Sequence, residues 1–89
     1  MEDEKNENNF GTSDFYLAAF LAAKGLKLNH VDRNDPRRFV FVFENVKHRE
    51  KLVQDFLFGD AEVEPKSFVG AIKNLKNLLY LDGREGLWK

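Results

Sequence analysis

Two histidines, His30 and His48, are the only imidazoles that could act as a general base, and the chain has no cysteine to act as a thiol nucleophile. A serine or threonine nucleophile needs a base beside it, and both histidines have simpler structural interpretations. We expect His30 to be half-buried on the apolar side of a strand and His48 to be an exposed helix residue. The inventory therefore predicts a protein that is not an enzyme.

The spacing of side chains does not indicate a metal site or a phosphate site. Asp32, Asn34 and Asp35 form a short polar cluster, but the glycine and the distal glutamate of a calcium loop are missing. The six glycines do not have the spacing that cradles a phosphate group. We predict no metal, no cofactor and no catalytic residue.

Positively charged residues are the polar groups that do gather into sets. The first set lies in a polar loop and at its exit and continues in the first turns of the next helix: Arg33, Arg37, Arg38, Lys47, Arg49 and Lys51. The second lies on the outer stripe of the last predicted helix and adds one aromatic residue: Lys66, Lys73, Lys76 and Tyr80. Lysine and arginine neutralise phosphates, so both sets are candidate nucleic-acid-binding surfaces. A solvated helix face has the same composition, and no common base-reading motif is present.

A run of nine apolar or aromatic residues at 15–23 has no polar side and predicts a buried helix. Ser13 or Asp14 can cap its start, and Lys24 followed by Gly25 ends it. A membrane span needs about 20 apolar residues, so this run is too short to be one. Acidic residues precede it, which excludes a signal peptide. We therefore predict no membrane association.

Two strands are expected after this helix. Residues 26–31 alternate between apolar and polar, residues 32–37 form a polar loop, and residues 38–44 give the strongest strand signal in the chain. Together they predict an antiparallel hairpin. The apolar side chains of the second strand fall on two faces: Phe39, Phe41 and Phe43 on one, Val40 and Val42 on the other.

The rest of the chain predicts two more helices. Asn45 is expected to cap a helix that ends at residues 58–59, and Pro65 to start a helix that reaches Leu81. The apolar stripe of the first of these is expected to hold Val46, Val53 and Leu57. A short edge strand is expected at 62–63. The predicted order is helix, strand, strand, helix, short strand, helix, which is an α+β domain with an antiparallel hairpin packed against three helices.

Length and composition predict one small domain. The chain has 89 residues, 43% of them hydrophobic, with nine phenylalanines to fill a core. Residues 1–11 hold four acids and one lysine and are predicted to be a disordered acidic tail. Residues 12–82 form the predicted domain, and 83–89 a loose C-terminal tail whose Leu87 and Trp88 either dock or stay mobile. The absence of cysteine indicates the reducing cytoplasm.

Six segments carry a resemblance to a known family. They are TSDFYLAAFL at 12–21, KG at 24–25, DR at 32–33, RFVFVF at 38–43, FLFG at 56–59 and LKNLLY at 75–80. Together they resemble a small bacterial and phage-associated domain family of unknown function over about residues 12–81. The resemblance implies a compact, stand-alone α+β domain without enzymatic activity, and it supplies no site residues.

The number of apolar faces predicts self-association. Both sides of the second strand and all sides of the first helix need cover, while the chain offers two more helices and a narrow sheet. We expect a homodimer, and the candidate contact residues are Phe20, Phe39, Val40, Phe41, Val42 and Phe43. The other possibility is a monomer whose helices wrap both faces. The expected function is a small non-enzymatic interaction protein, and the alternative is a nucleic-acid-binding accessory module.

Overall fold

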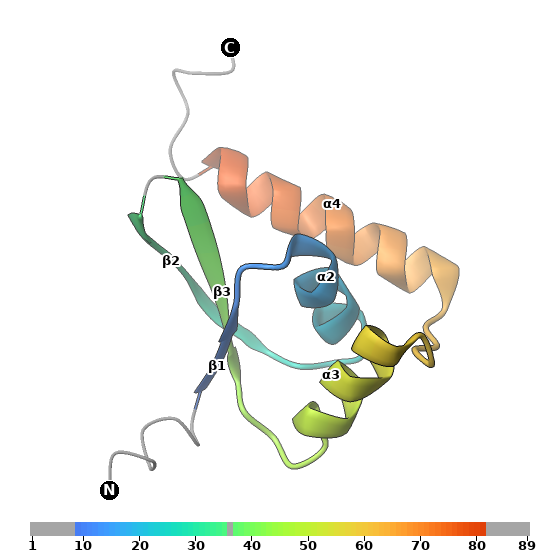
Figure 1. Cartoon of the computed structure of the whole chain (residues 1–89). Helices are drawn as coiled ribbons and strands as arrows, with labels where there is room; N and C mark the ends of the chain where they lie inside the picture. The colour runs from blue at the N-terminus through green and yellow to red at the C-terminus, as the bar shows by residue number, and fades with distance from the viewer. Residues whose placement is uncertain (1–8, 36, 82–89) are drawn as a thin grey trace, which may run out of the picture.

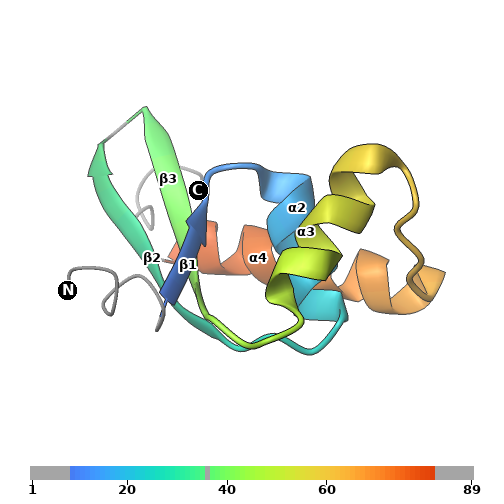
Figure 2. The same cartoon turned by 60° about the horizontal axis from the view of Figure 1, so that its bottom comes forward.

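Three strands and three helices form the computed structural model, which describes residues 9–35 and 37–81 (Figure 1). In chain order they are β1 (Asn9–Thr12), α2 (Phe15–Ala23), β2 (Leu28–Asp35), β3 (Arg38–Glu44), α3 (Arg49–Phe58) and α4 (Pro65–Leu81). The predicted α+β class is confirmed. The helices lie on one side of the sheet, and the other side has no described helix against it (Figure 2).

The helix α2 has the bounds that the sequence predicts. Its N-cap is Asp14, whose Oδ1 accepts hydrogen bonds from the backbone N–H groups of Tyr16 and Leu17, each at 3.1 Å. Its end is followed by Gly25 with φ of 101°, a left-handed conformation that glycine adopts without strain. Five consecutive side chains from Leu17 onward are buried. The helix is not covered on every side, however, because Tyr16 is 58% exposed.

The sheet has three strands in the order β1-β3-β2, whereas the sequence predicts a two-stranded hairpin. Both pairs are antiparallel, so β3 is the central strand. The chain leaves β1, crosses through α2, returns as β2 at the far edge, and only then fills the centre with β3. The antiparallel hairpin of β2 and β3 is confirmed, and the third strand is the finding that the sequence did not indicate.

The assignment of residues 9–11 to a disordered tail is wrong. These residues form most of β1, where Phe10 lies opposite Phe43 of β3. The partly buried ring of Phe10 packs against the core, which anchors a segment that its charge and polarity alone do not mark as structured. Residues 1–8 of the predicted tail, and the tail at 83–89, lie outside the described residues.

The strand β2 is longer and less regular than predicted. It continues through residues 32–35, which the sequence assigns to a loop, and its register with β3 is interrupted twice. One interruption lies between Leu28 and His30, where two steps along β2 oppose one step along β3. The extra residue moves His30 to the side of Val42, where it is exposed. The prediction of a half-buried His30 on the apolar side is therefore wrong.

The helix α3 begins later than predicted. Its first residue is Arg49, and the side chain of Asn45 accepts a hydrogen bond from Arg49 Nε at 2.9 Å in place of capping a helix. Its end at Gly59, with φ of 86°, agrees with the prediction. The short strand predicted at 62–63 is wrong, because residues 60–64 have no regular secondary structure.

The helix α4 has the predicted bounds and a capped start. The carboxylate of Glu64 accepts hydrogen bonds from the backbone N–H groups of Ser67 and Lys66 at 2.8 and 3.1 Å. These two hydrogen bonds, with that of Ser67 the larger cause, lower the pKa of Glu64 from its ordinary value. The first turn of α4 is thus held by a charge favourable at a helix N-terminus.

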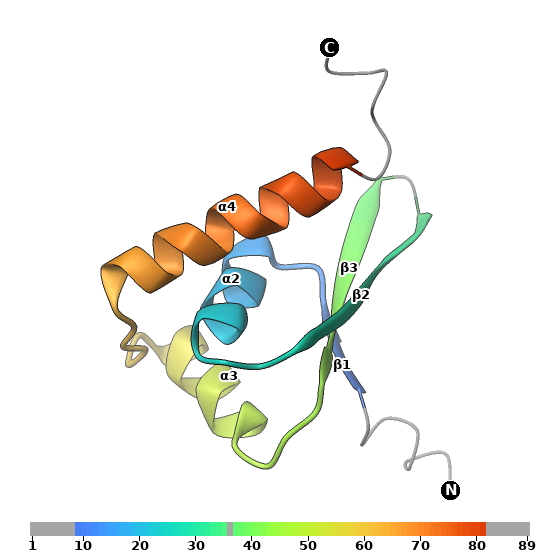
Figure 3. The ribbon, with the colours of Figure 1, turned by 180° about the vertical axis from the view of Figure 1, so that it is seen from behind.

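The core is centred on α2. This helix is enclosed by the sheet, α3 and α4 (Figure 3). The ring of Phe15 on α2 meets Phe41 of β3 edge-on at 6.0 Å between centroids, and Phe20 meets Phe56 of α3 at 5.6 Å. Three of the residues predicted for self-association are at most 2% exposed in this core: Phe20, Phe41 and Phe43. Their prediction as contact residues between copies is wrong, because helices of the same chain cover them.

Candidate interaction surfaces

The sheet face that points away from the helices is the first candidate surface. Val40 and Val42 lie at its centre, Gly11 is paired with Val42 on one side, and His30 and Asp32 are paired with the two valines on the other. We call these five residues the outer sheet face. A Cβ on Gly11 would lie 3.0 Å from Cγ1 of Val40, so glycine leaves room beside the valines. Both valines are partly exposed.

Charged residues close both ends of this face on the central strand. Arg38 and Glu44 are the first and last residues of β3, both are exposed, and alternation places them on the same side as Val40 and Val42. Read along β3, the outer side is therefore a cation, two valines and an anion.

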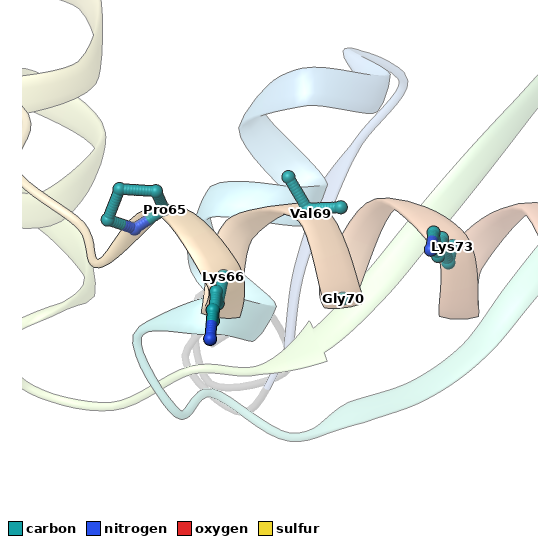
Figure 4. Close-up of a pocket in the computed structure, with 5 residues that line it drawn as sticks. All are labelled: Pro65, Lys66, Val69, Gly70 and Lys73. Atoms are coloured by element: carbon teal, nitrogen blue, oxygen red, sulfur yellow. The ribbon is translucent and has the colours of Figure 1, made fainter.

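The lysine stripe is the second candidate surface. Its residues recur at helical spacing along the exposed side of α4: Lys66, Val69, Lys73, Lys76 and Tyr80. Val69 is 49% exposed, and residues 65–81 contain no acid. A shallow hollow of about 370 Å³ lies along this helix, and Figure 4 shows Pro65 and Gly70 lining it together with Lys66, Val69 and Lys73. The predicted second set of cations thus shares one solvent-facing side.

The predicted first set of cations does not form one surface. Arg33, Arg37 and Arg38 lie at the hairpin end of the sheet, whereas Lys47, Arg49 and Lys51 follow the opposite end of β3. A strand of this length spans ~20 Å, so the structure separates the two halves of the set. Within the described residues, Lys51 contacts Asp55 at 3.2 Å and Arg37 contacts Asp35 at 3.9 Å, so both of these cations have an acidic neighbour.

Two arginines of the set have structural roles. The guanidinium of Arg33 lies 4.8 Å from the ring centre of Phe39, and its Nη2 donates to the carbonyl of Leu78 on α4 at 3.2 Å. The guanidinium of Arg49 lies 4.3 Å from the ring centre of Phe10. Arg33 therefore joins β2 to α4 through this hydrogen bond, and Arg49 joins α3 to β1 through a cation–π contact.

The α2–α4 groove is a third surface, and sequence reasoning missed it. It has a volume of about 460 Å³ and lies between the C-terminal end of α2, the start of β2 and α4. Small side chains at Ala22, Ala23 and Ala71 line it, Leu26 and Leu75 close its base, and Asn74 is a polar group within it. Small residues at the helical positions 67, 70, 71 and 74 are the sequence signal that could have indicated it.

The end of α3 exposes two large apolar side chains. Leu57 is 64% and Phe58 is 77% exposed, although the sequence pattern places Leu57 on the inward stripe. That part of the prediction is wrong, because the contact of Phe56 with Phe20 turns the neighbouring residue outward. Two adjacent exposed side chains are a smaller feature than a sheet face.

The described part of the chain has few groups of side chains that could form a metal site or a catalytic site. Within residues 9–35 and 37–81, no group of three histidine or acidic side chains is placed to hold a metal ion. No described helix is long and apolar enough to cross a membrane. Both histidines are exposed, and they lie on different parts of the fold. The surfaces above are therefore better candidates for function than any described cluster of reactive groups.

A family model for a domain of unknown function, DUF5659, matches residues 7–81. The chain belongs to the DUF5659 family. This confirms the resemblance to a small uncharacterised domain family, and the DUF5659 match also includes β1, which the resemblance left out. No curated protein and no solved structure matches the chain. The function of this DUF5659 domain must therefore be argued from its own surfaces.

Proposed function

We propose that this domain is a non-enzymatic interaction protein that forms a homodimer through its outer sheet face. The observation that carries the proposal is the one-sided cover of the sheet: all three described helices lie on the side of Phe41 and Phe43. Val40 and Val42 stay partly exposed on the central strand, where an antiparallel sheet open to water usually carries polar residues. The absence of cysteine suits the cytoplasm, where we place the protein.

The order of residues on β3 supports a two-fold arrangement. A two-fold axis that lies between two stacked sheets, over the centre of β3 and perpendicular to it, reverses the direction of the strand in the second copy. Arg38 of one copy then lies opposite Glu44 of the second copy, and Val40 lies opposite Val42. Each charged end of β3 then lies opposite a residue of opposite charge, and the valines form an apolar centre. An apolar centre with a polar rim is typical of protein interfaces.

Reversing one charge should weaken this dimer. The variant Arg38→Glu places like charges opposite each other at both ends of the interface, so we expect the dissociation constant to rise about tenfold or more. Glu44→Arg should do the same. The double variant Arg38→Glu/Glu44→Arg restores opposite charges and should restore dimerisation. Sedimentation equilibrium over a range of concentrations measures the dissociation constant of all four proteins.

Two outcomes would contradict the proposed dimer. If the mass of the protein without substitutions stays near 10.4 kDa at every concentration, the protein is a monomer. A dimer that is insensitive to both single charge reversals uses another surface, and Phe58→Lys, at the exposed end of α3, is the matched control for that case. We expect Phe58→Lys to leave the dissociation constant unchanged.

Nucleic-acid binding is the second candidate, favoured by the lysine stripe. Three lysines share one exposed side of α4 with Tyr80, and no acid lies between them. Lys66, Lys73 and Lys76 can contact phosphates, which would give affinity without base recognition. The predicted arginines contribute less, because Arg33 and Arg49 contact rings and backbone or side-chain groups of the domain itself.

Salt dependence tests this second candidate. Three phosphate contacts on duplex DNA should give a slope of about −2.7 for the logarithm of the binding constant against the logarithm of salt concentration. Replacing Lys66, Lys73 and Lys76 together with glutamine should abolish binding, measured by fluorescence anisotropy of labelled random duplex. Lys47→Gln is the control, because Lys47 lies between β3 and α3 and not on α4, and it should have no effect on binding. Equal binding by the triple variant and the unvaried protein would rule out the stripe.

A further inference from the structure

The α2–α4 groove has the size, lining and position to receive the C-terminal end of the chain. We propose that Leu87 and Trp88 of the same molecule fold back along α4 and dock into this groove. None of the residues of the outer sheet face lines the groove, so this inference is independent of the proposed dimer.

The lining of the groove matches the chemistry of these two side chains. Seven of its ten lining residues are alanine or leucine, which suit Leu87 and the carbon skeleton of an indole ring, and Ser67, Gly70 and Asn74 complete the lining. A buried indole N–H needs a hydrogen-bond acceptor, and Asn74, which lines the groove, has an amide oxygen that can accept a hydrogen bond. Leu78, which is 40% exposed, lines the groove toward the C-terminal end of α4 and continues its apolar surface in the direction of the tail.

The space in the groove depends on Gly70. A Cβ added at this position meets nothing within 4 Å, so the groove is open there. Glycine in the middle of a helix costs about 1 kcal/mol relative to alanine, and its φ is not in the left-handed region that would require glycine. A need for open space against α4 explains a residue that the helix itself disfavours.

The length of chain beyond α4 is sufficient. The helix ends at Leu81, and Asn74 lies seven residues earlier, which is about 10 Å along the helix axis. The seven residues from 82 to Trp88 can span about 23 Å when extended. Asp82-Gly83 is a dipeptide typical of turns and can reverse the chain at the end of the helix. The tail is therefore long enough to reach its own groove.

Trp88 is the only tryptophan, so its fluorescence reports directly on the docking. In the full chain we expect an emission maximum at shorter wavelength than that of N-acetyltryptophanamide, and an acrylamide quenching constant several-fold lower. Gly70→Gln places a side chain in the groove and should return both values to those of the free indole. Gly70→Ala adds only a methyl group and should have a smaller effect. Lys76→Gln introduces the same residue on another side of α4 and should have none.

The variants are not expected to unfold, because glutamine and alanine are better helix formers than glycine, and circular dichroism checks this. Emission like that of free indole in the unvaried protein would overturn the proposal. A short-wavelength emission that Gly70→Gln leaves unchanged would also overturn it, because the indole ring of Trp88 would then be buried outside the groove. An emission shift that disappears on dilution would assign the groove to the tail of a second copy and would equally overturn docking within one molecule.

Discussion

Replacing Phe43 with alanine is expected to lower the free energy of unfolding by about 3–5 kcal/mol. The side chain is fully buried and lies opposite Phe10 of β1 and Leu28 of β2, so its loss leaves a cavity where the three strands meet the helices. Domains are stable by only about 5–15 kcal/mol, so the variant should be close to unfolding. Urea denaturation followed by circular dichroism measures the change, at one protein concentration because the proposed dimerisation would add to stability.

Phe39→Ala is the matched control for Phe43→Ala. It makes the same truncation on the same strand and the same side of the sheet, but its ring is only partly buried and lies next to the guanidinium of Arg33. We expect it to cost about half as much, because the loss scales with the buried area and with the cavity left behind. Equal losses for the two variants would contradict the placement of Phe43 at the centre of the core.

Removing β1 should have the second largest effect. A chain that begins at Ser13 loses the four residues paired with β3, the partly buried ring of Phe10, and the contact of that ring with Arg49 of α3. The lost apolar burial and backbone hydrogen bonds together should lower the free energy of unfolding by about 2–4 kcal/mol. The unpaired edge of β3 should also promote aggregation. Urea denaturation and light scattering measure the two effects.

A chain that begins at Asn9 is the control for this truncation, because it keeps all of β1. The comparison between the two truncated chains isolates the strand from the residues before it. Phe10→Ala in the full-length chain separates the ring from the backbone pairing and should give about half of the loss. The prediction fails if the chains beginning at Asn9 and at Ser13 have the same stability.

Local signals in the sequence were sufficient for α2, β3 and α4. The start and stop of α2 depend on Asp14 and Gly25, which act on backbone groups within one turn. The alternation of phenylalanine and valine in β3 places the two kinds of residue on opposite faces whatever the strand pairs with. Pro65 likewise marks the start of α4. These features follow from residues near one another in the chain, so the sequence alone determined them, together with the α+β class.

Tertiary structure alone decided which surfaces are available. The pairing of Phe10 with Phe43 joins residues far apart in the chain, and no local pattern contains that information. The same holds for the irregular register that turns His30 outward, and for α2, which removes Phe20 from the surface. Strand pairing and helix cover depend on the free energy of the whole packed arrangement. They therefore decided that Val40 and Val42 face solvent and that the groove beside Gly70 is open.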